Sequence, residues 1–191
     1  MRKITLLLAT GIMLATAGCV PSLNPLYTKQ DLVFEAALVG VWAEDDAGKD
    51  TWAFERSGEE GYRLVYASDG KKGEFEVHLL KLGKTQFLDL YPDDAALSDL
   101  NRNDFYKAHL IAAHTFAKVT QIEPNLRMAF LNPDWLKEHL QKNPKAIRHE
   151  KINDDRIVLT ASTKELQEFV LKHAGEAFGD ASDLKRKKPK Q

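Results

Sequence analysis

The chain has 191 residues, a hydrophobic fraction of 43% and a formal net charge of -1, which is typical of one globular domain large enough to bury a core without metal or disulfide. Between Cys19 and Leu184 it carries 20 basic and 28 acidic residues, a net charge of -8. This acidic body argues against nucleic-acid binding, which needs cations to displace counterions from phosphate. The single cysteine excludes an intramolecular disulfide.

Residues 1–18 have the pattern of an export signal. Arg2 and Lys3 provide a positive start, and the apolar run 4–17 that follows has 14 residues. A membrane span needs about 20 residues, so this run favours a cleaved signal peptide. An ordinary secretory signal cut after Ala17, or a retained anchor, are the alternatives.

The stretch Ala17-Gly18-Cys19 resembles the end of a bacterial lipoprotein signal, in which small residues precede an invariant cysteine. The resemblance implies cleavage between Gly18 and Cys19 and attachment of acyl chains, such as palmitate, at Cys19. The membrane is then a partner through this lipid anchor. Val20 stands where an aspartate tends to retain such proteins in the inner membrane. We therefore expect the outer membrane, facing the periplasm, in a host that has one.

Four segments are expected along the chain. Residues 1–18 are the signal peptide, and residues 19–30, with Pro21 and Pro25, form a lipidated and extended tether, because proline disfavours helix. Residues 31–178 form the globular domain. Residues 179–191 carry the cations Lys185, Arg186, Lys187, Lys188 and Lys190, and such a run predicts a disordered basic tail.

The first part of the domain alternates between apolar and polar residues, which predicts half-buried strands. A short helical turn is expected within 31–40, followed by a strand around Trp42. Further strands are predicted at 51–56, 62–67, 74–80, 85–91, 113–122 and 125–131. The segment 92–109 breaks the period and predicts a loop with a short helix.

Two helices are predicted late in the chain. Asn132 and Pro133 suit the start of the first helix, which ends at Asn143-Pro144. A hairpin at 146–151 and 156–161 follows, with its turn at 153–155. The second helix begins at Ser162, which forms a capping box with Glu165.

Gly40-Val41-Trp42 resembles the G-x-W opening of lipocalins, in which the tryptophan closes the base of the barrel. The predicted fold is mainly β, with α+β as an alternative: an antiparallel meander forming a curved sheet or lipocalin-like half-barrel, with the two late helices packed on it. The chain is also similar to bacterial lipoproteins of unassigned function, and that resemblance implies no site.

Seven aromatic residues are candidates for lining a ligand cavity, with a packed core as the alternative: Trp42, Trp52, Phe54, Tyr62, Tyr66, Phe75 and Phe87. His109 and His114 have a spacing unsuited to joint metal binding, and His139 and His173 lie on apolar helix faces, where we expect packed or hydrogen-bonded rings. The serines match no nucleophile motif. We therefore expect no catalytic residues, no metal and no cofactor.

These observations predict a lipid-anchored envelope protein that is not an enzyme. Its expected role is a binding or accessory module for a small apolar ligand or a protein partner. A structural or assembly lipoprotein without ligand is the alternative, and a third is an envelope hydrolase with an unrecognised site. A lined cavity favours binding, and a filled interior favours the structural role.

Overall fold

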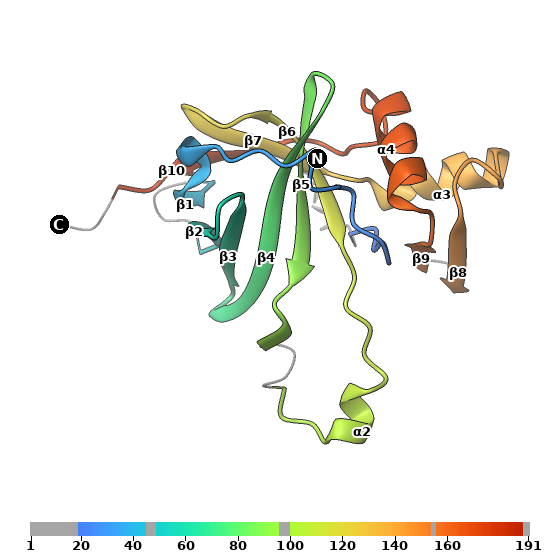
Figure 1. Ribbon diagram of the computed structural model, residues 1–191, viewed down its shortest axis with the longest axis horizontal. Coiled ribbons are helices and arrows are strands. Elements are labelled where there is room, and N and C mark those ends of the chain that lie inside the picture. The colour runs from blue at the N-terminus through green and yellow to red at the C-terminus, as the bar shows by residue number, and fades with distance from the viewer. Residues whose placement is uncertain (1–18, 45–48, 96–99, 154–155, 189–191) are drawn as a thin grey trace, which may run out of the picture.

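The computed structural model describes residues 19–44, 49–95, 100–153 and 156–188, and the predicted signal peptide lies outside them. Eight antiparallel strands form a closed barrel (Figure 1). They are β1 (Gly40–Ala43), β2 (Thr51–Ser57), β3 (Gly61–Ser68), β4 (Lys71–Leu82), β5 (Thr85–Pro92), β6 (Thr115–Gln121), β7 (Asn125–Phe130) and β10 (Ser182–Arg186). The predicted lipocalin-like meander is confirmed, and the sheet closes completely instead of stopping at a half-barrel.

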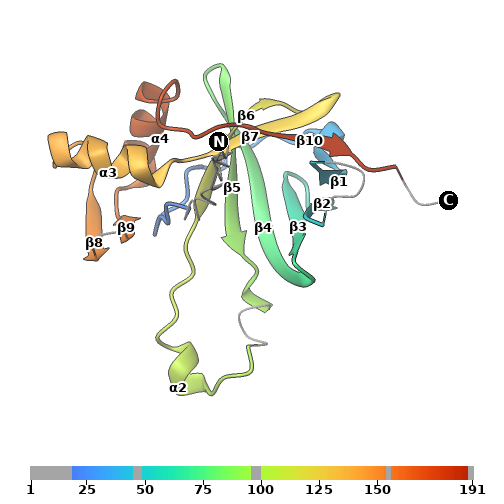
Figure 2. The same ribbon diagram turned by 180° about the vertical axis from the view of Figure 1, so that it is seen from behind.

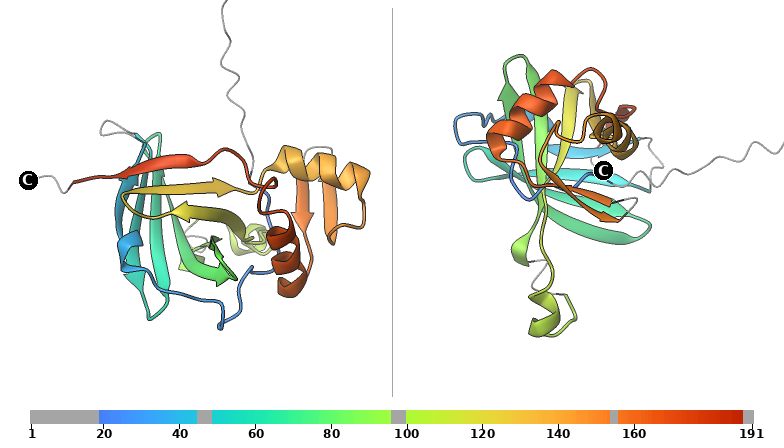
Figure 3. Two further views of the ribbon diagram at one scale, coloured as in Figure 1. Left: turned by 90° about the horizontal axis from the view of Figure 1, so that it is seen from above. Right: turned by 90° about the vertical axis from the view of Figure 1, so that its right-hand side faces the viewer.

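The remaining elements lie outside the barrel. A short 3-10 turn, η1 (Ala36–Leu38), precedes β1, and α2 (Asp104–Lys107) lies in the β5–β6 connection. Between β7 and β10 the chain forms α3 (Pro133–Lys142), the hairpin β8 (His149–Asn153) and β9 (Arg156–Leu159), and α4 (Thr163–Lys172). The helices α3 and α4 and the β8–β9 hairpin lie together at one end of the barrel (Figure 3, left), and the hairpin points in the same direction as the connection with α2 (Figures 1 and 2). The predicted hairpin turn falls partly outside the described residues, at 154–155.

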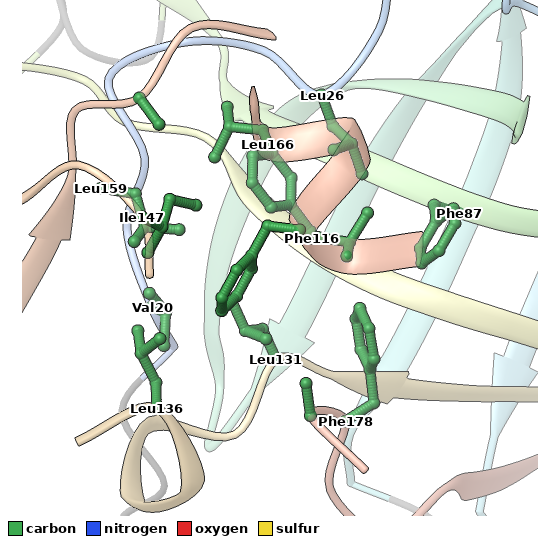
Figure 4. Close-up of a cluster of buried hydrophobic side chains, with 14 of the residues drawn as sticks. Val20, Leu26, Phe87, Phe116, Leu131, Leu136, Ile147, Leu159, Leu166 and Phe178 are labelled. Carbon is green, nitrogen blue, oxygen red and sulfur yellow. The ribbon is translucent and has the colours of Figure 1, made fainter. Parts of the chain in front are cut away.

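Two apolar clusters divide the core, because side chains on a strand alternate between the two faces of the sheet. The barrel interior contains Leu38, Trp42, Phe54, Tyr62, Leu64, Val77, Leu79, Leu88, Leu90, Ala117, Val119, Leu126, Met128 and Leu184. A second cluster lies between the outer face of β4–β7 and the helices α3 and α4. It includes Val20, Leu26, Phe87, Phe116, Leu131, Leu136, Ile147, Leu159, Leu166 and Phe178 (Figure 4). Both faces of β5 are therefore buried, as its apolar run requires.

The barrel closes around Trp42, whose side chain is fully buried. Its indole Nε1 donates to the carbonyl of Leu38 at 2.9 Å, and the guanidinium carbon of Arg186 lies 4.3 Å from the ring centroid. Arg186 also donates to the carbonyls of Val39, at 2.7 Å, and Ala37. A side chain at Gly40 would overlap this guanidinium group, and Gly40 has a φ of +142°. The glycine and the tryptophan of the G-x-W stretch thus both contact the last strand.

The prediction of a disordered tail at 179–191 is wrong over β10. Leu184 is 2% exposed inside the barrel, and β10 pairs with β7 and with β1. The backbone of β10 bonds to two neighbouring strands whatever its side chains are, while Lys185 extends into solvent and Arg186 packs over the Trp42 ring. Residues 189–191 lie outside the described part of the chain.

The tether predicted at 19–30 is extended, and it packs on the barrel along most of its length. Residues 20–33, here named the N-terminal strap, pack on the outside of the barrel, where Val20, Ser22 and Leu26 are buried. Ser22 exchanges backbone hydrogen bonds with His114 at 2.9 and 2.8 Å, and the amide of Leu23 donates to the carbonyl of Leu159. The prolines keep the strap extended, and Val20 and Leu26 pack in the second cluster.

Candidate functional site

The seven aromatic residues do not form one cavity lining. Trp42, Phe54 and Tyr62 are at most 1% exposed in the barrel interior, where Trp52, Tyr66 and Phe75 pack against them as partly buried residues. Phe87 lies in the second cluster (Figure 4). Successive side chains on a strand point to opposite faces, so Phe87 points out of the barrel while Leu88, the next residue on β5, points into it. Its assignment to a common cavity is therefore wrong, whereas side chains surround Trp42, Phe54 and Tyr62, and Trp52, Tyr66 and Phe75 keep part of their surface exposed.

Cys19 is exposed at the beginning of the described chain, and Gly18 lies outside it. The next residue, Val20, is already buried against α3 and β9 in the second cluster. A group attached to the Cys19 thiol would therefore be held directly against the folded body. The lipidation and cleavage predicted at these positions stay predictions.

A groove of about 960 Å³ lies between the second half of α3, the segment 143–148 and α4. Its floor includes Phe169 and Ile147, both buried. The two helices begin at strong caps. The Asn132 side chain accepts the amides of Asp134 and Trp135, and Ser162 and Glu165 form the predicted capping box. These caps fix where α3 and α4 begin, and the two helices form the walls of the groove.

The groove is basic on an acidic chain. Its lining contains the cations Lys142, Lys145, Arg148 and Lys172 and the anions Glu165 and Glu168. The carboxylate of Glu165 already has partners within the chain. Its Oε2 lies 2.5 Å from Arg148 Nη2 and also accepts hydrogen bonds from the Ser162 amide and hydroxyl. The Ser162 hydrogen bonds and the Arg148 contact lower the pKa of Glu165 to about 2. The remaining lysines leave a surplus of positive charge for a ligand.

Four aromatic rings pack together at one wall of the groove. His139, His173 and Phe169 line the groove, and Trp135 packs against His139. Trp135 stacks on His139 with centroids 4.7 Å apart, and His139 meets His173 edge-to-face at 4.6 Å. Phe169 lies 4.9 Å from His173, whose Nδ1 is 2.8 Å from Glu176 Oε1. The expectation of packed histidines is confirmed for this pair by these contacts and by the burial of His173.

The pKa of His139 lies below its ordinary value near 6.5. Burial is the main cause, and His173, Lys172 and Lys142 add to it, while the carboxylate of Glu176 opposes it. The folded chain thus favours the neutral ring, and the unfolded chain binds more protons as the pH falls below about 6.5. The stability contributed by the neutral ring is present above that pH and is lost as the pH falls through the lowered pKa.

A second polar cluster lies under the N-terminal strap. Asp89 is 1% exposed, and its carboxyl oxygens lie 2.7 Å from the Leu26 amide and 2.7 Å from His114 Nδ1. An Asp–His pair beside a serine is the arrangement of a hydrolase. The Ser22 hydroxyl, however, donates to the carbonyl of Asn24 at 2.8 Å, so it is not oriented toward the His114 ring. The geometry supports a structural role in which Asp89 holds the strap.

Sequence reasoning missed both the groove and this cluster. The one signal for Asp89 is its position in the strand FLDLY, where apolar residues flank it on both faces. Among the described residues there is no group of three or more His, Cys, Asp or Glu side chains placed to hold a metal ion. No helix in the described ranges is long and apolar enough to cross a membrane. Comparisons with protein-family models, curated proteins and solved structures found no match.

Proposed function

We propose that this chain is a lipid-anchored protein of the bacterial cell envelope, on the outer membrane facing the periplasm, and that it acts as a non-catalytic binding module. The observation that carries the proposal is the basic groove between α3 and α4, outside a barrel whose interior is filled by side chains. A small apolar ligand would have to displace packed core residues, whereas the groove is accessible. We therefore favour a protein partner over a small apolar ligand.

The groove favours an acidic polypeptide segment with an apolar side chain. Lys142, Lys145 and Lys172 provide positive charge along the rim, and Phe169 and Ile147 provide an apolar floor. Complementary charge directs association and fixes register, while a buried apolar anchor supplies affinity. The partner proposed here is a segment of this kind in another envelope protein.

The anchor makes a first prediction. Intact mass spectrometry of the protein extracted from membranes is expected to show a chain that begins at Cys19 and carries acyl chains. Several chains at about 0.8 kcal/mol per buried methylene give a stable anchor. Cys19→Ser is expected to leave the barrel folded and to abolish the acylated species. A chain that retains Gly18 and a free thiol would refute the anchor.

The groove makes a second prediction. A photo-crosslinking residue at Lys145, in the intact protein in cells, is expected to capture a polypeptide whose joined peptide is rich in Asp and Glu. Lys142→Glu is expected to lower this yield about fivefold, because reversing one rim charge in a binding groove changes the binding free energy by about 1 kcal/mol.

The exposed Lys72 on β4 offers matched controls. A crosslinker at Lys72 reports random collisions, and Lys72→Glu makes the same charge change away from the groove. Equal capture at Lys72 and Lys145, or a yield that Lys142→Glu leaves unchanged, would remove the groove from the proposal.

A further inference from the structure

The exposed large apolar side chains are concentrated at one place on the fold. Nine are exposed among the described residues, and five of these lie in the twelve-residue segment 100–111, which contains α2. They are Leu100, Phe105, Tyr106, Leu110 and Ile111, and Phe105 and Ile111 are each 79% exposed. A cluster of this kind marks an interaction surface, whereas scattered exposed residues do not.

This segment, here named the α2 loop, is attached next to the predicted anchor. Ser22 is three residues from Cys19, and its backbone pairs with His114, which follows the α2 loop, and with Leu159 at the end of β9. Two further exposed apolar residues lie on the strap and on β8, the partner of β9. They are Leu23 and Ile152, and the Ile152 side chain is 61% exposed. The α2 loop projects from the barrel, and the β8–β9 hairpin, at the end that carries α3 and α4, points in the same direction (Figures 1 and 2). Only Val41 and Leu171 of the nine lie elsewhere.

The polar groups of the α2 loop are largely satisfied within it. The amides of residues 107–110 all donate to carbonyls within 103–107. The Asn103 side chain accepts from the Tyr106 amide, and the His109 ring bonds to the Phe105 carbonyl at 2.7 Å. A backbone that bonds internally can enter a region poor in water at low cost. Five of the side chains left outside are aromatic or aliphatic, the types that prefer the membrane interface.

We propose that the α2 loop inserts its apolar side chains into the lipid bilayer beside the anchor and so fixes the orientation of the barrel on the membrane. This inference rests on the proposed lipid anchor. The strap packs on the barrel from Val20 onward, so no flexible spacer separates the anchor from the loop. The bilayer is therefore always close to the loop, at a high effective concentration. The charged residues at 100–111 are Arg102, Asp104 and Lys107, without the acidic excess of the rest of the body.

The test uses the mature lipidated chain reconstituted into phosphatidylcholine vesicles. Because the sequence contains one cysteine, and acylation consumes its thiol, an introduced cysteine carries the only label. Ile111→Cys and the control Leu171→Cys, which replaces a 43% exposed residue on α4, receive the same environment-sensitive fluorophore. We expect the label at 111 to shift its emission to the blue and to be quenched severalfold more strongly by nitroxides on the lipid acyl chains.

Equal quenching at both positions would overturn the proposal. So would a blue shift that appears in detergent without vesicles and grows with protein concentration, because a second copy would then cover the loop. If the mass of the chain shows that Cys19 is not acylated, the proposed anchor fails separately. The unlipidated chain is then sedimented with the same vesicles: loss of binding in Ile111→Ser but not in Leu171→Ser supports insertion, and equal sedimentation of the two refutes it.

Discussion

Replacing Trp42 by alanine is expected to lower the free energy of unfolding by about 3–5 kcal/mol, the range found when a large buried aromatic side chain is removed. The indole fills the closing end of the barrel, donates to Leu38 and lies under Arg186. Its removal would leave a cavity and take away the ring surface on which the guanidinium group packs. Urea denaturation followed by circular dichroism measures the change.

Two substitutions separate this effect from general sensitivity of β1. Val41→Ala, at the neighbouring and exposed position, is expected to cost less than about 1 kcal/mol. Trp42→Phe keeps a ring but loses the hydrogen bond to Leu38, so its cost should fall between the two. A denaturation midpoint unchanged in Trp42→Ala would contradict the observed closure.

Asp89→Ala is expected to cost about 3 kcal/mol, because it leaves the buried Leu26 amide and the His114 ring without their shared partner. The loss should begin in the strap, where the Leu26 amide bonds directly to the carboxyl group. Hydrogen exchange at Leu26 is therefore expected to accelerate more than exchange within β3 or β4.

Asp50→Ala, at an exposed position before β2, is the control and should change stability by less than about 0.5 kcal/mol. Asp89→Asn tests the geometry, since an amide keeps one acceptor and cannot serve both donors in the same way. The free energy of unfolding of Asp89→Asn should lie between that of the unchanged protein and that of Asp89→Ala. If Leu26 exchanged at the normal rate in Asp89→Ala, Asp89 would not be what holds the strap.

Elements defined by local patterns were predictable from the sequence. The alternation in 74–80 identified β4 because one face of that strand lies inside the barrel. Asn132 and Ser162 identified the starts of α3 and α4 because a cap satisfies backbone amides within three residues of itself. Each of these signals depends on neighbours in the chain, so no tertiary contact was needed to interpret it.

The features that depend on distant partners were not predictable in this way. β10 has a single inward apolar residue, Leu184, and its strand structure comes from pairing with β7 and β1. The strap is ordered by Asp89, His114 and Leu159, none of which is near it in sequence. The groove exists because α3 and α4 pack side by side, and its lysines, taken singly, look like ordinary surface residues.

Closure of the barrel by its last strand also has a consequence for the order in which the chain folds. Trp42 pairs in register with Arg186, so β1 cannot gain its second neighbour until the chain up to residue 186 is available for pairing. A barrel built from such distant pairings folds slowly, because loop-closure entropy is lost before the contacts form. Until then β1 and β7 are open edges, on which another unfinished chain can add a strand. Chains that end before residue 182 should therefore aggregate rather than accumulate as soluble barrels.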